Sequence, residues 1–393
     1  MFSSAKEQVN IMRVQRTHLR ESNEPFFELI NESGQPIPIV SGFLRHLRTR
    51  GYSPNTLSAY AYDLLHFMTF LSEEHLSYQE FTPARSLQFL EYLFTLPSRR
   101  QAQRLALVLC TTEQGSSATR LAPTTINRIF AAVSSFYEFL IVSEQFPYQE
   151  NPILKVDDPA YARVSDRHHP FMGRASRQRP VRRTVRVKTV QRVPRPMTDE
   201  QVSQLLTSLR LKRDKAMLFL LLQGGLRPGE VLNLRLEDVS YARRRVTIRY
   251  RTDHPKGVRT KSRTERVVDL HQPETLQAVS DYVMSERPQE TESPYLFLVG
   301  GAGKRRTEPL GYHAVVKLFE RHCERLGIRD PWITPHALRH THATKLWEGG
   351  MRELTLQKRL GHASPESTRM YTRVADPIVV AEYRQALGKE VQP

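Results

Sequence analysis

The spacing of apolar residues predicts helices along most of the first half of the chain. Apolar side chains recur three or four positions apart in four stretches: VSGFLRHLRTRG (40–51), SPNTLSAYAYDLLHFMTFLSEE (53–74), TPARSLQFLEYLFTL (82–96) and APTTINRIFAAVSSFYEFLIVSE (122–144). Ser53 is the expected N-cap of the second helix, with Pro54 at its first helical position, and threonines are expected to cap the fourth. Upstream, PFFELI (25–30) and PIPIV (36–40) flank the turn-forming NESGQ and predict a short β element.

A second patterned region follows. TDEQVSQLLTSL (198–209) predicts a helix with Thr and Asp at its start, and the apolar helix RDKAMLFLLLQGG after it ends at Gly224 and Gly225. RRVTIRY (244–250) and ERVVDLH (265–271) predict the strands of a hairpin, joined by the basic turn RTDHPKGVRTKSRT. Helical patterns return in HAVVKLFERHCERLG (313–327), PHALRHTHATKLWEGG (335–350), ELTLQKRLGH (353–362) and the tail segment DPIVVAEYRQALGKE (376–390).

These patterns indicate a chain that is mainly α with small β elements. Its length suits two domains, each able to bury its own core. The expected parts are an N-terminal extension with a short β segment at 1–35, a helical domain at 36–154, a linker at 155–196, and a mixed α/β domain with a tail helix at 197–393.

The charge of the chain favours a polyanionic partner. With 393 residues, a formal net charge of +17 and a pI near 10.0, nucleic acid is the first expectation and an acidic membrane surface the second. Cys110 and Cys323 are too few for a disulfide framework. The longest apolar run, AMLFLLL (216–222), is too short to span a bilayer, and the N-terminus lacks the apolar region of a signal peptide. A cytoplasmic protein without membrane contact is therefore expected.

The predicted linker is rich in arginine, interrupted by proline and nearly devoid of acidic residues. It has too few apolar residues to form a core, so it is expected to connect the domains. A solvated connector is one interpretation. Contact with a phosphate backbone is the preferred one, because the basic side chains repel one another without a counter-charge. The expected backbone contacts are Arg174, Arg177, Arg179, Arg182, Arg183, Arg186, Lys188 and Arg192.

TPHALRHTHA (334–343) carries three histidines and an arginine with almost nothing acidic nearby. His336 and Arg339 lie one helical turn apart and face one target, and the absence of a carboxylate suits a bound phosphodiester. No cysteine or acidic ligand completes a zinc site, so no metal is expected. His340 and His342 are interpreted as packing or hydrogen-bonded helix residues, and Glu230 as a structural neighbour of Arg227.

Four stretches of the second domain resemble, in order and spacing, the catalytic domain of the tyrosine recombinases, the phage-integrase family. They are GGLRPGEVLNLRLEDV, RTKSRTERVVDL, TPHALRHTHAT and LQKRLGHASPESTRMYTRV. The family pattern is an arginine in a GLR turn, a hairpin lysine, an HxxR pair, a histidine in an LGH segment and a tyrosine soon after it. The matching positions are Arg227, Lys261, His336, Arg339, His362 and Tyr371. Residues 36–154 resemble the helical core-binding domain of the family, and the implied fold of the catalytic domain is the DNA breaking-rejoining fold.

The resemblance implies a role for each residue. Tyr371 is the expected nucleophile, giving a 3′-phosphotyrosyl intermediate that conserves bond energy, so neither metal, cofactor nor ATP is expected. Lys261, on a mobile hairpin, is the expected general acid, with Lys256 in the same turn as the alternative. His336 is expected to move a proton to or from the tyrosine, and His362 to hydrogen-bond the phosphate.

The implied function is site-specific recombination of double-stranded DNA by a homotetramer, with accessory or partner proteins possible. The N-terminal β segment and the long linker favour a recombinase of transposons or integrative elements. The alternatives are a resolvase of chromosome or plasmid dimers, a DNA-binding regulator that does not cleave, and a type IB topoisomerase. The tail segment is expected to pack on its own domain or on a neighbouring subunit.

Overall fold

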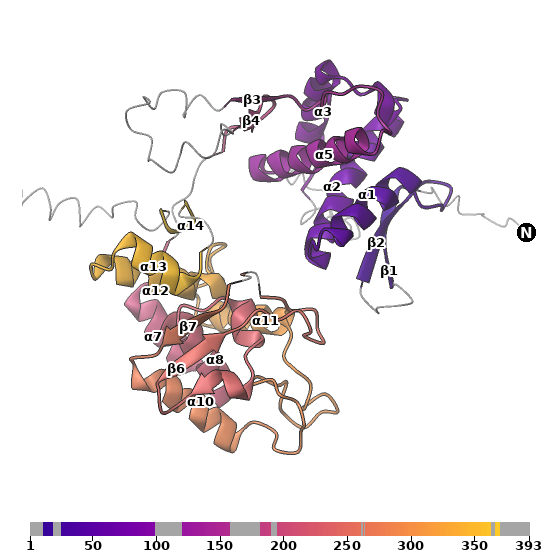
Figure 1. Cartoon of the computed structure of the whole chain (residues 1–393). Coiled ribbons are helices and arrows are strands. Elements are labelled where there is room, and N and C mark those ends of the chain that lie inside the picture. The colour runs from indigo at the N-terminus through magenta and orange to yellow at the C-terminus, as the bar shows by residue number, and fades with distance from the viewer. Residues whose placement is uncertain are drawn as a thin grey trace, which may run out of the picture. The chain divides into compact units, whose positions relative to one another are not determined.

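The computed structural model describes residues 11–18, 25–98, 120–157, 181–189, 195–260, 262, 264–362 and 366–369. The chain forms two compact units, residues 1–190 and residues 191–393, each with its own core. Figure 1 colours the first unit from indigo to magenta and the second from pink to yellow. Both consist mainly of helices with small sheets, as the sequence pattern predicts.

The first unit contains the four predicted helices. They are α1 (Pro38–Thr49), α2 (Pro54–Glu73), α3 (Pro83–Thr95) and α5 (Pro123–Val142), with a 3-10 turn η1 (Tyr78–Glu80) between α2 and α3. Ser53 caps α2 as predicted, because its hydroxyl accepts a hydrogen bond from the backbone N–H of Thr56 at 3.2 Å. The prediction of a threonine cap for α5 is wrong: its N-cap is Ala122, which has no capping side chain.

The N-terminal β element differs from its prediction. Strands β1 (Arg13–His18) and β2 (Pro25–Ile30) form an antiparallel hairpin, so the partner of PFFELI precedes it in the chain. The predicted strand at 36–40 is wrong, because only Pro36 bridges to Ile30 and α1 begins at Pro38. A proline suits the first turn of a helix, where its missing N–H leaves no hydrogen bond unmade.

Aromatic rings fill the core between α2, α3 and α5. Phe67 of α2 contacts Phe81, Phe89 and Tyr137 edge-on, with ring centroids 5.0–5.9 Å apart. Within the described residues, α5 is the one helix with the length and hydropathy of a membrane span, and half of that window is buried in this unit.

Residues 155–157 and 181–189 of the predicted linker differ from expectation, because they are folded onto the first unit. Strand β3 (Lys155–Asp157) pairs with β4 (Val181–Arg183), and the side chain of Asn127 on α5 forms two 2.9 Å hydrogen bonds with the backbone of Val187. Val185 and Val187 pack against the core. The alternation of valine with basic residues supplies enough apolar surface for one side of an extended segment to be buried.

The second unit combines helices with a small sheet. They are α7 (Asp199–Ser208), α8 (Lys212–Leu222), α9 (Pro228–Leu232), α10 (Pro273–Ser285), α11 (Tyr312–Arg325), α12 (Pro335–Glu348), α13 (Glu353–Leu360) and α14 (Glu366–Arg369). Apolar α8 packs against α10 and α12. The predicted hairpin is part of a three-stranded sheet, β5 (Val239–Ser240), β6 (Arg245–Ile248) and β7 (Arg266–Asp269), in the order β5-β6-β7. A 3-10 turn, η4 (Leu236–Asp238), leads into β5.

Candidate active site

Arg227 projects from a corner between α8 and α9. The chain leaves α8 through Gly225, which has a positive φ of 65° and lies so close to His342 that an added Cβ would collide with the imidazole ring. Arg227 is the N-cap of α9, whose first residue is Pro228. Its side chain is 19% exposed and donates hydrogen bonds to Glu230 at 2.8 Å and to the carbonyl of Gly361 at 3.1 Å. The turn between α8 and α9 therefore holds the guanidinium in place and leaves it partly exposed to solvent.

Arg339 links three segments from within the domain. It lies on α12, one turn after His336, and its side chain is only 4% exposed. Its guanidinium donates to the carbonyls of Gly225 at 2.5 Å and Leu360 at 2.7 Å. The same side chain lies 3.0 Å from Nε2 of His362. Arg227, Arg339 and His362, far apart in sequence, are thereby brought together as the sequence pattern predicts.

A buried carboxylate lies among these arginines, which corrects the expectation that none is near. Glu230 is 1% exposed. It accepts two hydrogen bonds from the side chain of Arg266, at 2.8 and 2.9 Å, and two from Arg227, one from the backbone N–H and one from the guanidinium. It also lies 3.9 Å from Arg339. The interpretation of Glu230 as a neighbour of Arg227 agrees with this geometry. Its contacts with Arg266 and Arg339 are not local in sequence.

The charge of this cluster suits an anion. Burial raises the pKa of Glu230, but the hydrogen bonds and charge of Arg266, with the charges of Arg227 and Arg339, bring it down to about 2. The carboxylate is therefore ionised at neutral pH. Three guanidiniums around one carboxylate leave an excess of two positive charges. The carboxylate orders the arginines without cancelling the charge available to a bound phosphate.

His362 is neutral in this environment. Burial and the charges of Arg339, Arg227 and Arg266 lower its pKa to about 3. Because an arginine can only donate, Nε2 accepts from Arg339, and Nδ1 carries the proton and donates to Thr368 at 2.8 Å. In this tautomer Nε2 has no proton, so it can donate a hydrogen bond to a phosphate only after the proton moves to Nε2 or a second proton is added, and after the contact with Arg339 is released. The predicted role of His362 at the phosphate stays a prediction.

The other histidines of α12 differ in their surroundings. His336 is half-buried on the same helix as Arg339. Burial, with the charges of His336 and Arg339, lowers the pKa of His340 to about 4. His342 is buried, its pKa is lowered to about 3 by burial and by the charge of Arg359, and it accepts a hydrogen bond from Arg359 at 3.2 Å. This agrees with the interpretation of His342 as a packing and hydrogen-bonded residue.

Two predicted catalytic residues, Lys261 and Tyr371, lie outside the described residues. Helix α14 ends at Arg369, shortly before the tyrosine. Lys256, the alternative hairpin lysine, is described and forms an ion pair with Glu308 at 2.9 Å. Among the described residues, no group of histidine, cysteine and acidic side chains is arranged to hold a metal ion.

Arg266 is the site residue that sequence reasoning missed. It is the first residue of β7, its side chain is 8% exposed, and it joins the carbonyl of Arg359 to the carboxylate of Glu230. Its position within ERVVDLH, the predicted return strand of the hairpin, is only a weak signal. Nothing in the local pattern indicates a carboxylate partner at position 230.

Glu230→Gln is expected to lower the free energy of unfolding of the second unit by about 3–5 kcal/mol, because it leaves buried arginines without their counter-charge. The chain's two tryptophans, Trp332 and Trp347, both lie in this unit, so their fluorescence in a urea titration reports its unfolding. Glu237→Gln is the matched control. Its side chain is 57% exposed, and the expected loss is below about 1 kcal/mol. Equal losses in the two variants would contradict the central role of Glu230.

Arginines held in place to surround an anion are typical of enzymes that transfer phosphate esters. Comparison with known proteins identifies which kind. The model of the phage integrase family matches residues 195–377, and the model of the phage integrase N-terminal SAM-like domain matches residues 40–144. The chain belongs to the phage integrase family and is a tyrosine-type site-specific recombinase.

The chain is similar to two kinds of curated relative. It is 29% identical over 384 residues to transposase A from transposon Tn554 of Staphylococcus aureus, covering 96% of this chain and 99% of that protein. It is 27% identical over 359 residues to tyrosine recombinase XerC of Caldanaerobacter subterraneus subsp. tengcongensis, covering 90% of this chain and 86% of that protein.

Solved structures share the fold. The Tn1549 transposon integrase in complex with transposon right end DNA matches with a TM-score of 0.56 and 18% sequence identity, covering 88% of this chain and 98% of that one. A lambda integrase dimer bound to a core site matches with a TM-score of 0.52 and 15% identity, covering 86% of this chain and 97% of that one. The predicted fold class, a helical domain followed by a mixed catalytic domain, is confirmed.

Proposed function

We propose that the protein recombines double-stranded DNA at the ends of a mobile element, cleaving and rejoining strands through a 3′-phosphotyrosyl intermediate at Tyr371. The observation that carries the proposal is the cluster of three arginines around Glu230, with its excess of two positive charges. Negative charge gathers on the non-bridging oxygens when a phosphodiester is attacked, and fixed cations stabilise that charge. Arginine suits the task because it does not lose its proton.

The remaining residues complete the proposed chemistry. The Tyr371 oxygen attacks phosphorus and displaces the 5′-oxygen of the next nucleotide, which takes a proton from Lys261. His336, one turn before Arg339 on α12, exchanges a proton with the tyrosine. The new ester keeps the energy of the old one, so a second strand can be joined by the reverse of the same step.

The relatives favour a mobile element over the alternative of a dimer resolvase. The match to transposase A of Tn554 covers nearly the whole of both proteins, whereas the match to XerC leaves more of each uncovered. The Tn1549 integrase, a transposon protein, shares the fold. The proposal includes action in the cytoplasm as a homotetramer on DNA, with the tail segment at 376–390, which lies outside the described residues, packed on its own or a neighbouring subunit.

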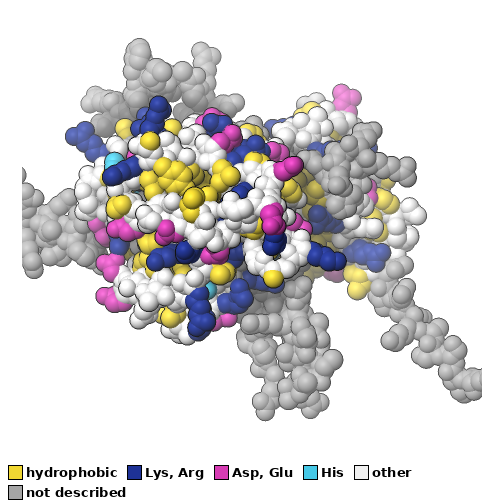
Figure 2. Space-filling view, turned by 90° about the horizontal axis from the view of Figure 1, so that it is seen from below, with side chains coloured by type: hydrophobic (Ala, Val, Ile, Leu, Met, Phe, Trp, Pro, Cys, Tyr) yellow, Lys and Arg dark blue, Asp and Glu magenta, His cyan; other side chains and the backbone are white. Residues whose placement is uncertain are grey.

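The folded part of the predicted linker supports contact with DNA. On the face shown in Figure 2, Lys and Arg side chains are interspersed with Asp and Glu, so net charge alone does not mark a DNA surface there. In residues 181–189 the basic side chains differ in exposure. Arg182, Arg186 and Lys188 are exposed, whereas Arg183 is half-buried and burial lowers its pKa. We propose that the three exposed residues contact phosphates. The other predicted contacts, Arg174, Arg177, Arg179 and Arg192, lie outside the described residues.

Alanine at all three of Arg182, Arg186 and Lys188 is expected to flatten the dependence of log K on log salt by about one unit per residue. Each phosphate contact releases a counterion, so removing contacts removes salt dependence. Fluorescence anisotropy of labelled duplex DNA over a range of NaCl concentrations measures this slope. Arg183→Ala is the control and leaves the slope unchanged. A slope that is the same in the triple variant and the wild type would exclude this surface.

A nicked duplex tests the proposed function. Its cleavage strand ends shortly after a candidate element end, so that the released fragment diffuses away and the covalent complex accumulates. We expect a protein–DNA adduct whose DNA-linked peptide contains Tyr371, and strand-exchanged products on intact duplexes. Binding without an adduct on every candidate end would indicate a regulator. An adduct with relaxation of supercoils and no exchange would indicate a topoisomerase.

A further inference from the structure

The connection between β6 and β7, which carries both candidate lysines, is fastened along its described length. Arg251 begins it and forms ion pairs with the buried Asp238 and with Glu237. Its guanidinium also donates to the carbonyl of Asn233 at 3.1 Å, at the end of α9. Thr260 closes the segment by accepting a hydrogen bond from the backbone of Arg251 at 3.0 Å. These contacts join both ends of residues 251–260, which we call the lysine arm, to each other and to neighbouring elements.

A second attachment holds the middle of the lysine arm. His254 is 4% exposed and packs edge-on against Tyr295, with ring centroids 4.8 Å apart. Asp253 pairs with Arg235 at 2.6 Å, and Arg235 in turn lies over the ring of Tyr295. The backbone then turns sharply, because the N–H of Gly257 donates to the carbonyl of His254 at 2.8 Å.

Lys256 provides the third attachment. Its ammonium lies 2.9 Å from the carboxylate of Glu308, and its aliphatic carbons pack against Gly311 at the start of α11. The side chain is 31% exposed. A lysine in this position is directed toward Glu308. To protonate a leaving oxygen it would have to break this ion pair.

The end of the lysine arm rests on the helix that presents Arg227. Val258 and Thr260 are buried, and the carbonyl of Arg259 would lie 3.0 Å from a Cβ added to Gly229. Gly229 is the second residue of α9, two positions after Arg227. This close approach fixes the arm relative to the phosphate-binding arginine. The described arm ends one residue before Lys261.

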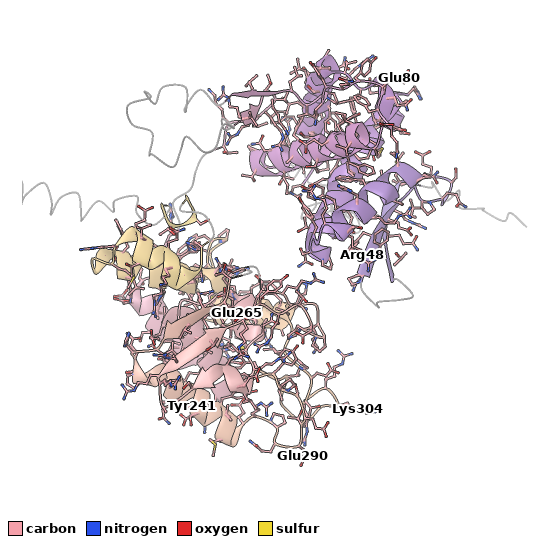
Figure 3. The ribbon with its side chains drawn as sticks, viewed as in Figure 1. Arg48, Glu80, Tyr241, Glu265, Glu290 and Lys304 are labelled. Atoms are coloured by element: carbon pink, nitrogen blue, oxygen red, sulfur yellow. The ribbon has the colours of Figure 1, made fainter. Side chains whose placement is uncertain are left out.

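We propose that Lys256 is a positioning residue: its ion pair with Glu308 fixes the lysine arm so that the residue following Thr260, Lys261, delivers the proton to the 5′-oxygen. The inference rests on the proposed function and deepens it, because it assigns different tasks to the two lysines of one turn. Figure 3 labels Glu265, where the connection returns to β7.

Arginine substitutions separate the two roles. Arginine keeps an ion pair but cannot give up its proton. Lys256→Arg is therefore expected to cleave within about threefold of the wild type, because 31% exposure leaves room for the larger head group. Lys261→Arg is expected to lose about 10²–10⁴-fold, the usual contribution of a general acid. If Lys256→Arg lost as much as Lys261→Arg is expected to lose, Lys256 would be the proton donor and the proposal would be wrong.

A double-mutant cycle tests the attachment. Lys256→Met and Glu308→Gln are each expected to slow cleavage of ordinary DNA by about 10- to 100-fold, because a small misplacement of a catalytic group is costly. The double variant is expected to be no slower than either single variant, since all three lack the same ion pair. Single variants with the wild-type rate, or losses that multiply, would overturn the proposal.

A substrate with sulfur in place of the bridging 5′-oxygen distinguishes positioning from general damage. A thiolate leaves without a proton, so Lys256→Met and Glu308→Gln are expected to cleave this substrate within about threefold of the wild type. Equal slowing on both substrates would mean that the ion pair stabilises the fold or the binding of the phosphate, and does not position the proton donor. Absence of a wild-type adduct would refute the proposed function and this inference together, whereas a normal adduct with unaffected variants would refute this inference alone.

Discussion

Replacing Arg227 by alanine is expected to reduce the rate of strand cleavage by about 10³–10⁵-fold, the contribution of a cation that stabilises a phosphoryl-transfer transition state. The reason is its position. Arg227 is the partly open member of the cluster, at 19% exposure against 4% for Arg339 and 8% for Arg266. Because its guanidinium is the most exposed of the three, it is the one expected to contact a bound phosphate.

DNA binding is expected to change little in Arg227→Ala, because one phosphate contact among many contributes a small part of the affinity. Single-turnover cleavage of a nicked duplex, with anisotropy for binding, measures both quantities. Arg227→Lys is the conservative control; it keeps the charge but loses the planar fork that binds two oxygens, so partial activity is expected. A loss of tenfold or less in Arg227→Ala would mean that the phosphate is held elsewhere.

Arg339→Ala is a less specific test than Arg227→Ala. Arg339 donates to the carbonyls of Gly225 and Leu360 and so joins α8, α12 and α13. Its removal leaves those buried acceptors without a partner and destabilises the unit as well as the reaction. A loss of cleavage in this variant therefore has to be compared with its unfolding curve before it is assigned to catalysis.

Replacing Tyr371 by phenylalanine is expected to abolish the covalent adduct and every strand-exchange product. The substitution removes the hydroxyl oxygen that is proposed to form the new ester and keeps the aromatic ring. Duplex affinity is expected to stay within about twofold, since no charge is removed. The measurement is the yield of protein–DNA adduct on a nicked duplex, resolved on a denaturing gel. Tyr383→Phe, in the tail segment, is the matched control and keeps the adduct. An adduct in Tyr371→Phe would place the nucleophile on another residue.

Much of the fold could be predicted because its signals are local. Ser53 followed by Pro54 starts α2, and Thr198 with Gln201 forms the capping box that starts α7. The predictions of secondary structure are wrong where a local sequence pattern is compatible with two structures. PIPIV alternates like a strand, yet Pro38 begins α1 because the apolar residues after it fit the helical face of the core. Residues 181–189 resemble a linker in composition, yet Val185 and Val187 pack against the core of the first unit, and Asn127 on α5 forms hydrogen bonds with the backbone of Val187.

The sequence by itself determined the family of this protein and predicted the residues of its site. The order and spacing of Arg227, His336, Arg339 and His362 predict an arginine-based phosphate site, and short-range rules explain how Pro228 and one helical turn present them. Only the tertiary structure decided what holds these residues. Glu230 forms its ion pair with Arg266, which is 36 positions away in the sequence. Lys256 pairs with Glu308, and helix α10 lies between the two residues in the sequence. Such pairs cannot be read from the periodicity of the sequence, because the packing of whole elements, and not the neighbours of a residue in sequence, decides which charges come together.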